Sequence, residues 1–385
     1  MRILLSLYYY RPYVSGLTIY VERLAAALVR RGHAVTALTS QYDAESPREE
    51  WSDGVRILRV PVAIRISKGV IMPSLGRVAS ELVREHDVLG IHLPNVDAPG
   101  LTIRGQLQNK PVILTYHCDL QLPRSPFNRL IDQGVFVAHY GAARLADKIV
   151  TYTRDYATHS RLLSRFDDKL VVIPPPVIMP APPTDEVEAF KAKVCSDGGP
   201  VIGMACRFAA EKGVEHLVEA MPGLLERFPR AKVLFAGEYE DVLGEQEYRE
   251  RLRGPIERLG SRWQFLGLLD QSQMPAFYSS CDALVSPSLN STESFGLAQV
   301  EAMMCGTPAV VSDLPGVRQP IKMTGMGEIV EPGSASALLE GLERVLSHPD
   351  RYVRPRQEIE VQFDLDHTVD SYLDLFEREM ARRAG

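Results

Sequence analysis

The stretch DALVSPSLNSTESFGLAQVEAMMCGTPAVVS, residues 282–312, contains the clearest structural pattern of the chain. DALVSPS and TPAVVS, at its two ends, are short apolar runs with the length and composition of buried strands. Between them the pattern predicts a helix that begins near Phe295 or Gly296 and stops at Gly306, with Pro308 just beyond. A strand, a helix and a second strand in this order form the repeating unit of a parallel α/β sheet.

The same alternation of apolar runs and amphipathic segments continues through almost the whole chain. The expected strands are RILLSLY, HAVTALT, VRILRV, DVLGIHL, PVILTYH, KIVTYT and KLVVIPP in the first half, and PVIGMAC, AKVLFAG, WQFLGLL, DALVSPS, TPAVVS and GEIVEP in the second. A proline-rich run, IPPPVIMPAPPT at 173–184, separates the halves, and it cannot lie inside a sheet. A helix from about Thr18 to Arg31, closed by Gly32, follows the first strand.

We therefore expect an α/β protein with two doubly wound, Rossmann-like domains that face a central cleft. The first comprises residues 1–175, a Pro-rich linker spans 176–184, and the second comprises residues 185–360. The last amphipathic helix, from about Thr368 to Arg383, needs an apolar surface to cover. We expect residues 361–385 to pack back on the first domain.

The composition of the 385 residues excludes several classes of protein. A net charge of -6 argues against a general nucleic-acid binder, which needs a basic face for phosphates. The chain has no Walker A loop and no GxGxxG, which argues against a P-loop NTPase or a dinucleotide dehydrogenase. The cysteines are scattered without a CxxC pair and suggest neither a zinc site nor a disulfide framework; they are Cys118, Cys195, Cys206, Cys281 and Cys305. No apolar run approaches the ~18 residues of a spanning helix. We expect a cytoplasmic protein, whose membrane contact, if any, is peripheral at the inner face.

The loop before the helix near Phe295 carries candidate ligand-binding groups. Residues 290–294 lie at the carboxyl end of the strand DALVSPS, where open α/β sheets bind their ligands. The free N–H groups of the helix favour an anion, and Gly296 has no side chain that would keep a phosphate from the backbone. A carboxylate beside a phosphate is repelled by it unless the carboxylate accepts hydrogen bonds from other groups. Sugar hydroxyls supply such hydrogen bonds. The spacing matches a nucleoside diphosphate sugar, with Glu293 on the sugar and Glu301 on the ribose. The alternative is one solvated glutamate and one that the helix dipole favours.

A second loop offers two cations. GMACRFAAEKGVEHLVEA, residues 203–220, predicts a strand, a short loop with Arg207, Glu211 and Lys212, and a helix from about Gly213. The planar fork of arginine and the mobile charge of lysine together suit the neutralisation of a departing diphosphate. Taken alone, the same loop would more often be a solvated surface loop.

These segments resemble the retaining glycosyltransferases of family 4, which have the GT-B fold. In the second half the resemblance lies in RFAAEKG, FLG at 265–267, VSPS and ESFGLAQVEAMMCGTPAVVSDLPGVR; in the first half it lies in YYYRPYVSGLTIYVERLAAALVRRGHAV and TYHCD. It implies a hexosyltransferase of glycan or glycolipid biosynthesis that uses a nucleoside diphosphate sugar. A UDP-sugar is favoured as donor, GDP-mannose is the alternative, and the acceptor would be a hydroxyl of a lipid, a glycan or a small molecule.

The resemblance also implies roles for individual residues. The catalytic set is His117, Arg207, Lys212 and Glu293, and the donor-binding set is Gly16, Gly267, Phe295, Gly296, Leu297 and Glu301. Arg207 and Lys212 would stabilise the leaving group, and His117 would reach the sugar from across the cleft. Gly16 would let the first loop close over the phosphates. The family usually has Gly-Gly at this loop, whereas this chain has Ser15-Gly16.

The implied reaction retains the anomeric configuration, yet no carboxylate nucleophile is evident in the first domain. We therefore expect attack from the face of the leaving group, with a phosphate oxygen helping to accept the hydroxyl proton of the acceptor. Neither a metal ion nor another cofactor is required. The acidic segment DLD, residues 364–366, is interpreted as helix capping and not as a metal-binding motif.

The acceptor side of the sequence is less specific. The candidate acceptor contacts are Tyr10, Asn95 and Asp119, and the tyrosines near the first loop could form a platform for a carbohydrate or a headgroup. The basic region 143–170 is typical of solvated helix faces or of contact with anionic lipid. Two other functions stay open. A catalytically silent nucleotide-sugar-binding subunit would be expected to lack Lys212 or Glu293, and a GT-B epimerase would need carboxylates on both faces of the sugar.

Overall fold

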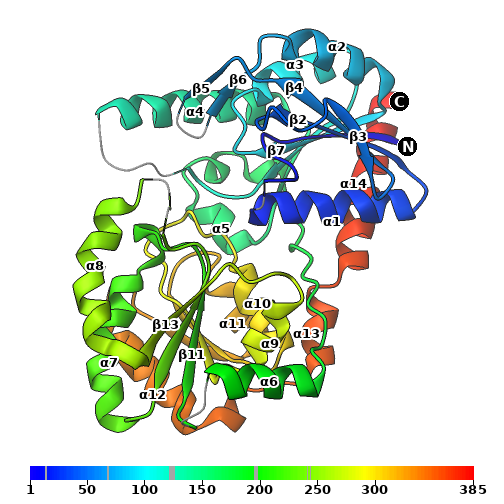
Figure 1. The fold of residues 1–385 in the computed structure, drawn as a ribbon. Helices are drawn as coiled ribbons and strands as arrows, with labels where there is room; N and C mark the ends of the chain where they lie inside the picture. Colours follow the sequence, from blue (N-terminus) through cyan, green and yellow to red (C-terminus); the bar gives the residue numbers. More distant parts are fainter. Residues whose placement is uncertain (14, 67–68, 121–125, 195–197, 241, 243) are drawn as a thin grey trace. The chain divides into compact units, whose positions relative to one another are not determined.

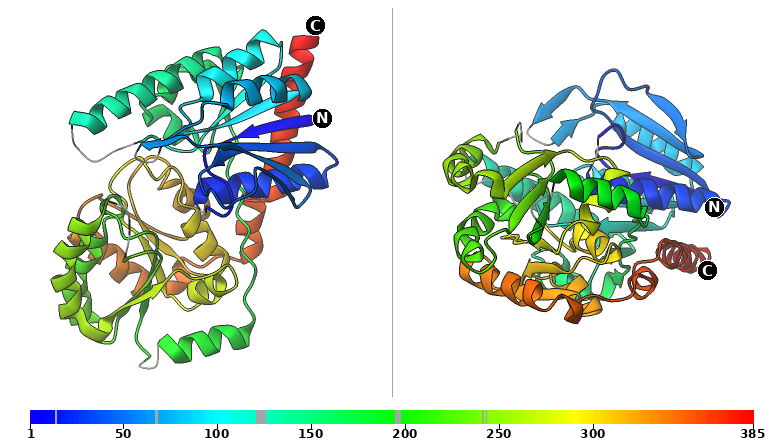
Figure 2. Two further views of the ribbon diagram at one scale, coloured as in Figure 1. Left: turned by 45° about the horizontal axis from the view of Figure 1, so that its top comes forward. Right: turned by 60° about the horizontal axis from the view of Figure 1, so that its bottom comes forward.

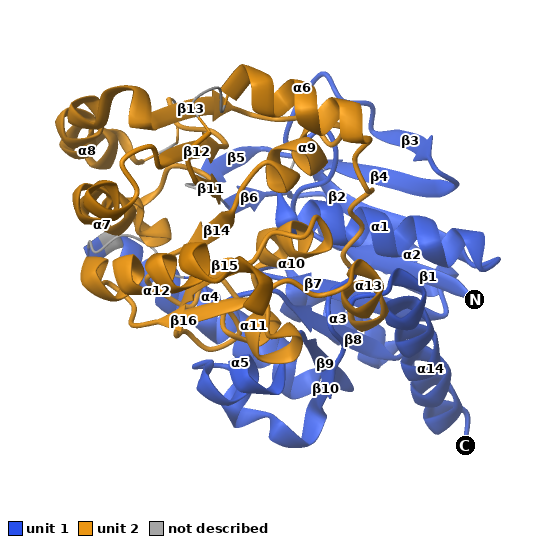
Figure 3. Ribbon diagram, turned by 90° about the horizontal axis from the view of Figure 1, so that it is seen from below, with its two compact units in different colours: residues 1–176, 363–385 blue, residues 177–362 orange. Residues whose placement is uncertain are grey.

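The computed structural model describes all residues except 14, 67–68, 121–125, 195–197, 241 and 243 (Figure 1). The chain divides into two compact units, which Figure 3 colours separately. Unit 1 comprises residues 1–176 and 363–385, and unit 2 comprises residues 177–362. The segment expected as a linker, 176–184, lies mainly at the start of unit 2, and its last residue begins the first helix of that unit.

Unit 1 contains a largely parallel sheet. Its described strands are β1 (Arg2–Ser6), β2 (Ala34–Gln41), β3 (Glu49–Ser52), β4 (Val55–Pro61), β7 (Val88–Leu93), β8 (Val112–Tyr116), β9 (Lys148–Thr151) and β10 (Leu170–Val172). They lie in the order β10-β9-β8-β7-β1-β2-β4-β3, and β3 is antiparallel to β4. Every residue of β7 and β8 is buried, which explains why these strands are mainly apolar and do not alternate with polar residues.

Helices cover both faces of this sheet (Figure 1). Their bounds are α1 (Gly16–Arg30), α2 (Leu75–Glu85), α3 (Ala98–Leu107), α4 (Pro126–Leu145), α5 (Arg154–His159) and α14 (Leu365–Ala384). Leu4 of β1 and Leu89 of β7 share one core cluster with apolar residues of α2, α3, α4 and α5. The helix α1 packs on β2 and also contacts α14.

The C-terminal helix α14 is part of unit 1. In Figures 1 and 2 it is red and runs beside α1, which is blue. Its Tyr372 hydroxyl lies 2.8 Å from the Tyr20 hydroxyl of α1 and 2.9 Å from Thr115 Oγ1 of β8. Asp364 caps the helix by accepting a hydrogen bond from the His367 N–H, which confirms the interpretation of the acidic segment DLD as capping.

Unit 2 contains a parallel sheet in the order β13-β12-β11-β14-β15-β16. The strands are β11 (Val201–Ala205), β12 (Lys232–Ala236), β13 (Trp263–Gly267), β14 (Ala283–Ser286), β15 (Ala309–Ser312) and β16 (Gly327–Val330). The helices are α6 (Thr184–Val194), α7 (Val214–Arg227), α8 (Gln246–Leu259), α9 (Gln273–Ser279), α10 (Leu297–Met304), α11 (Gln319–Thr324), α12 (Ala335–Ser347) and α13 (Arg356–Gln362). Both sheets are doubly wound, and all the strands expected from the sequence are confirmed.

Chain order reverses once in each sheet, and ligands of open α/β sheets bind outside the strand ends at such a switch point. In unit 2 the reversal lies between β11 and β14, and in unit 1 it lies between β1 and β7. The edge strand β3 and the antiparallel pair of β5 (Ile64–Ile66) and β6 (Gly69–Ile71) were not predicted, because β3 is polar and mostly exposed and the other two do not lie within a long apolar run.

Candidate active site

The switch point of unit 2 brings together the loop after β11 and the loop after β14, which carry Lys212 and Glu293, 81 residues apart in the sequence. The Leu289 N–H, after β14, donates a 2.9 Å hydrogen bond to the Glu211 carbonyl oxygen, after β11. Gly213 lies at φ +66°, and a Cβ there would lie 2.2 Å from the Pro287 carbonyl oxygen. Because glycine alone permits both this backbone conformation and this close approach, Gly213 keeps the two loops together.

At the centre of these loops Lys212 and Glu293 form an ion pair. Lys212 Nζ lies 2.6 Å from Glu293 Oε2, and the side chains are 19% and 25% exposed. Burial by itself lowers the pKa of Lys212, but the charge of Glu293 and its hydrogen bond outweigh burial and raise that pKa. Lys212 is therefore firmly cationic at neutral pH. The sequence placed both residues in one site but did not predict that they bind each other.

The helix α10 begins directly at this ion pair. Glu293 Oε1 accepts a 3.1 Å hydrogen bond from the Gly296 N–H, so the carboxylate joins the cation to the start of the helix. Gly296 has φ +91°, and a Cβ there would lie 2.1 Å from Gln299 Nε2, which itself donates to the Val317 carbonyl oxygen. Glycine is therefore required at this position, and the helix begins one residue after it, at Leu297.

The other expected donor residues of unit 2 lie in the loop after β11, just before and within α10, and at the end of β13. Arg207, 45% exposed, donates to Glu211 Oε1 at 3.0 Å. Glu301, further along α10, accepts a 3.0 Å hydrogen bond from the Tyr278 hydroxyl of α9. The Phe295 side chain is buried, and the contact of its backbone with a ligand stays a prediction. Gly267 ends β13, two strands away from β11, and its carbonyl oxygen accepts from the Gly237 N–H.

In unit 1, His117 follows β8 directly and lies in a buried network. Its Nε2 is 3.0 Å from His92 Nδ1, its Nδ1 is hydrogen-bonded to the Tyr152 hydroxyl, and the ring meets the edge of Tyr20. Burial lowers the pKa of His92 to about 3, and burial together with His92 holds the pKa of His117 well below its usual range. Both imidazoles are therefore neutral at pH 7. The sequence singled out His117 but did not predict this network, and the contact of His117 with a sugar stays a prediction.

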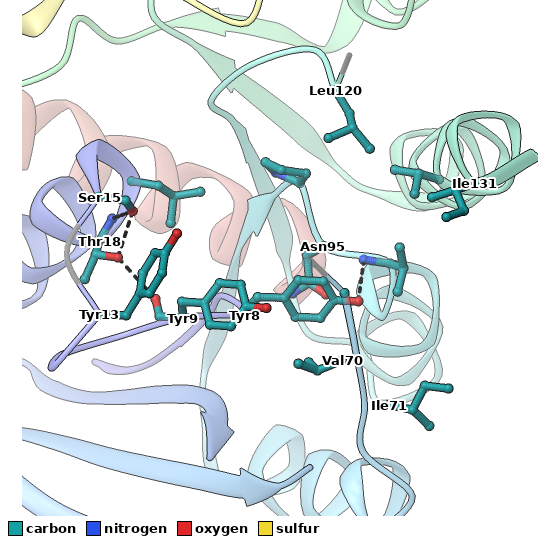
Figure 4. A pocket seen from close by; sticks show the side chains of 15 residues that line it. Tyr8, Tyr9, Tyr13, Ser15, Thr18, Val70, Ile71, Asn95, Leu120 and Ile131 are labelled. Carbon is teal, nitrogen blue, oxygen red and sulfur yellow. Dashed lines mark hydrogen bonds between the residues drawn. The ribbon is translucent and has the colours of Figure 1, made fainter. Parts of the chain in front are cut away.

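One expected acceptor residue needs correction. Tyr10 is 3% exposed, and burial raises the pKa of its hydroxyl. It is a core residue, because its place in the loop after β1 turns its ring into unit 1. Its neighbours Tyr8, Tyr9 and Tyr13 instead line a pocket of about 360 Å³, and their role as a platform for an acceptor stays a prediction (Figure 4).

This pocket lies at the switch point of unit 1 and includes Asn95, whose contact with an acceptor stays a prediction. The Asn95 N–H donates a 3.0 Å hydrogen bond to His139 Nε2, which fixes the loop. Asp119 is outside the lining of the pocket. Its carboxylate accepts 2.7 Å hydrogen bonds from the Tyr116 and Ser160 hydroxyls, so it is held by unit 1 itself.

The loop at Ser15-Gly16 has a clear local structure. Ser15 is the N-cap of α1: its backbone is extended, at φ -153° and ψ 166°, and its Oγ accepts a 3.2 Å hydrogen bond from the Thr18 N–H. Gly16 is then the first residue of the helix. A serine is thus compatible with a position where the family usually has glycine, because extended backbone needs no glycine.

The basic region 143–170 is largely engaged with the protein. Lys169 Nζ donates to the Ala143, Arg144 and Ala146 carbonyl oxygens at the end of α4, and Arg154 and Arg161 pair with Asp167 and Asp132. Over the part of the chain that is described, no helix is long and apolar enough to cross a membrane, and no group of three or more acidic, histidine or cysteine side chains could hold a metal ion. Cys195 lies outside the described residues, and the other four cysteines are free thiols.

Known protein families match both units. The model of glycosyl transferases group 1 matches residues 185–361, and the model of glycosyltransferase family 4 matches residues 14–178. Phosphatidyl-myo-inositol mannosyltransferase of Mycobacterium tuberculosis strain H37Rv is 26% identical over 356 residues, which cover 88% of this chain and 86% of that protein. The 2-deoxystreptamine glucosyltransferase of Streptomyces kanamyceticus is 25% identical over 393 residues, which cover 94% and 99%.

Solved structures share the fold. Sucrose-phosphate synthase from Thermosynechococcus elongatus has a TM-score of 0.79 at 21% identity and matches 99% of each chain. Anabaena HepE in complex with UDP-glucose has a TM-score of 0.77 at 17% identity, over 98% of this chain and 100% of that one. Because the two family models match the two units in turn, and the fold is that of GT-B enzymes, the chain belongs to the family 4 glycosyltransferases and is a hexosyltransferase.

Proposed function

We propose that this enzyme transfers a hexosyl group from a nucleoside diphosphate sugar to a hydroxyl of a lipid, glycan or small-molecule acceptor, with retention of the anomeric configuration. A UDP-sugar is the favoured donor, GDP-mannose is the alternative, and no metal ion takes part. The observation that carries the proposal is the linked set of Lys212, Glu293 and the Gly296 N–H at the start of α10. This set offers a fixed cation to a diphosphate and carboxylate oxygens to sugar hydroxyls, and the first turn of α10, from Leu297 on, supplies backbone donors.

The proposed chemistry follows from these groups. The bond between the anomeric carbon and the phosphate oxygen breaks as the acceptor oxygen bonds to the same face of that carbon. The acceptor hydroxyl proton passes to a phosphate oxygen of the departing nucleoside diphosphate. Lys212, Arg207 and the start of α10 stabilise the negative charge that grows on the leaving group. Glu293 can bind a sugar hydroxyl while it keeps Lys212, because a carboxylate has about four acceptor sites. From unit 1, His117 is proposed to contact the sugar.

The comparisons support the donor class. The curated relatives are named as mannosyl-, glucosyl- and N-acetylglucosaminyltransferases, and HepE has been solved with UDP and with UDP-glucose. The relatives' names differ in both sugar and acceptor, so for this chain the donor base, the sugar and the acceptor are matters for experiment.

The test is to incubate the purified protein with a panel of UDP-, GDP- and ADP-sugars and to follow nucleotide release, with and without lipid or glycan acceptors. The proposal predicts release from one donor class, unchanged by EDTA, and a product whose anomeric proton coupling in NMR matches that of the donor. Inverted product would contradict the mechanism. Binding without turnover would indicate a silent subunit, and an isomerised nucleotide sugar would indicate an epimerase.

A further inference from the structure

Resting on the proposed function, we propose that the pocket of unit 1 binds an aliphatic chain of the acceptor, so that the acceptor is an amphiphile with its hydroxyl on the headgroup. The pocket has a volume of about 360 Å³ and lies wholly within unit 1 (Figure 4). This size is within the range of small-molecule sites. The following observations decide which chemistry fits it.

The walls of the pocket are mainly aliphatic. The aliphatic lining side chains come from separate segments of unit 1, and they are Leu17, Val70, Ile71, Val96, Leu120, Ile131 and Val135. Figure 4 shows Val70 and Ile71 on one side of the row formed by Tyr8, Tyr9 and Tyr13, and Leu120 and Ile131 on another. A glycan here would lose its hydration against surfaces that offer few partners, which costs free energy for every unpaired hydroxyl. An alkyl chain has no such cost.

Several polar groups of the lining are already bound within the protein. The Tyr8 hydroxyl accepts a 3.1 Å hydrogen bond from the Val96 N–H, and Ser15 Oγ caps α1. Asn95 Oδ1 accepts a 3.0 Å hydrogen bond from the Asp97 N–H. These bonds turn the polar atoms toward the protein, so that mainly the apolar faces of the rings and the aliphatic side chains remain for a ligand.

The apolar surface also continues outward from the pocket. Ile71 and Val96, which line it, are 44% and 40% exposed. On the elements that carry lining residues, Ile64 of β5, paired with Ile71 of β6, is 55% exposed, and Leu130 of α4, beside Ile131, is 72% exposed. A closed site for a compact molecule would end at a polar rim, whereas exposed aliphatic side chains near the pocket suit a chain longer than the pocket.

The inner end of the pocket reaches the start of α1, where Ser15, Leu17 and Thr18 line it. Gly16, the residue expected at the donor phosphates, lies between Ser15 and Leu17 in the same turn. A chain held in the pocket would therefore direct its headgroup toward the loop that is expected to meet the donor. This placement connects the pocket to the transfer reaction and not to an unrelated ligand.

The test measures binding of single-chain alkyl glucosides, from butyl to dodecyl, by titration calorimetry below their critical micelle concentrations and without donor. We expect the affinity to rise roughly fourfold per added methylene and to level off once the pocket is filled. A Kd independent of chain length would overturn the proposal. Tighter binding of phenyl glucoside than of octyl glucoside would mean a planar aromatic occupant. Binding that appears only when the titration is repeated above the micelle concentration would mean a membrane-facing surface. Either result overturns the proposal too.

Two valines of α4 provide a matched pair of variants. Val135 lines the pocket, whereas Val137, two residues on, is 67% exposed and outside the lining. Val135→Asp should abolish the dependence on chain length, and Val137→Asp should keep it. Val135→Trp, which adds apolar bulk without a charge, should make the affinity level off at a shorter chain. An unchanged profile in both Val135 variants, with melting temperatures like the wild type, would contradict the assignment. The glucoside titrations contain no donor. If they contradict the binding of an alkyl chain, the proposed sugar transfer is still tested independently by nucleotide release in the donor panel.

Discussion

Lys212 gains a second partner during the proposed cycle. It binds Glu293 in the free enzyme, and it binds both Glu293 and the diphosphate once a donor is present. The 2.6 Å ion pair keeps the ammonium group half-buried and charged before the donor arrives. Such preorganisation lets the cation act without reorientation as charge develops on the leaving group. Lys212→Ala should therefore reduce kcat by about 10²-fold or more, and the measurement is steady-state nucleotide release.

The control for Lys212→Ala is Lys191→Ala, which removes an exposed lysine of the same unit on α6. It should leave turnover and the melting temperature near those of the wild type. Equal turnover in the two variants would remove Lys212 from the mechanism.

For single residues of the candidate site, the sequence predicted which residue types occur there but not which of them contact each other. Glycine at 296, a lysine in the first loop and a glutamate in the second were all recognisable, because each has a chemical reason to be there. That Lys212 and Glu293 bind each other depends on how two loops approach, which no local pattern records. Tyr10 was misassigned for a related reason: four tyrosines near one loop look alike in the sequence, and packing alone decides which is buried.

Among the elements, the helix α1 has a serine N-cap, Ser15, whose contribution to the stability of unit 1 can be tested by substitution. Ser15 Oγ satisfies the Thr18 N–H, one of the otherwise unpaired donors of the first turn. Ser15→Ala should lower the free energy of unfolding by about 1 kcal/mol, whereas Ser15→Gly, the residue common in the family, should cost only a few tenths of that. Urea unfolding followed by circular dichroism measures both. A larger loss for glycine than for alanine would show that Ser15 does not act as a cap.

The strand ends of β7 and β8 and the helix α4 carry buried histidines that should make unit 1 sensitive to acid. Burial lowers the pKa of His92 to about 3 and of His139 to about 4, and the pKa of His117 lies well below its usual range. In the unfolded chain these groups bind protons below pH ~6.5, while the folded chain stays unprotonated. The unfolded state thus binds more protons, so this stability is complete above pH ~6.5 and decreases as the pH falls toward the folded pKa values.

At pH 5 the expected loss is about 2 kcal/mol for each such histidine relative to pH 7.5. The measurement is the urea midpoint at pH 7.5, 6 and 5, with His92→Gln as the comparison. That variant should lose less stability between pH 7.5 and pH 5 than the wild type does. The same pH dependence in both proteins would contradict the assignment to His92.

For the whole molecule, the chain returns to unit 1 at Phe363, within the segment 361–385 that the sequence led us to expect on the first domain. Asp147, just before β9, secures the end of α14: its side chain, 6% exposed, lies 2.7 Å from both Arg382 and Arg383 and accepts from the Val112 N–H. Asp147→Ala would leave Arg383 and that N–H without this partner. We expect it to cost about 3 kcal/mol or more of the free energy of unfolding.

The matched control is Asp370→Ala at the other end of α14. Asp370 pairs with Arg31 at 2.7 Å, but its side chain is 55% exposed, so we expect a loss of at most about 1 kcal/mol. Urea unfolding of the two variants gives the comparison. Similar small losses in both would mean that α14 is held by its apolar face, through residues such as Val369 and Phe376, and not by Asp147.

The fold as a whole was predictable because the apolar runs that indicate its strands recur regularly along the sequence. Thirteen short apolar runs, spaced by amphipathic segments, leave little alternative to doubly wound parallel sheets, and all of them are strands in the structure. The pocket of unit 1 was not predicted, because its walls come from residues as distant as Leu17 and Val135 and no pattern in the sequence brings them together.

The central claim is that the start of α10, with Lys212 and Glu293, binds the diphosphate of a nucleotide sugar. Its most direct test is calorimetric titration of the nucleoside diphosphate of the accepted donor against the matching nucleoside, in the wild type and in Lys212→Ala. Because each charged hydrogen bond contributes about 1.5–3 kcal/mol, we predict that the diphosphate binds about 10²-fold tighter or more, and that Lys212→Ala loses at least ~10-fold of this preference. Equal affinity for nucleoside and nucleoside diphosphate in the wild type, or an undiminished preference in Lys212→Ala, would contradict the account.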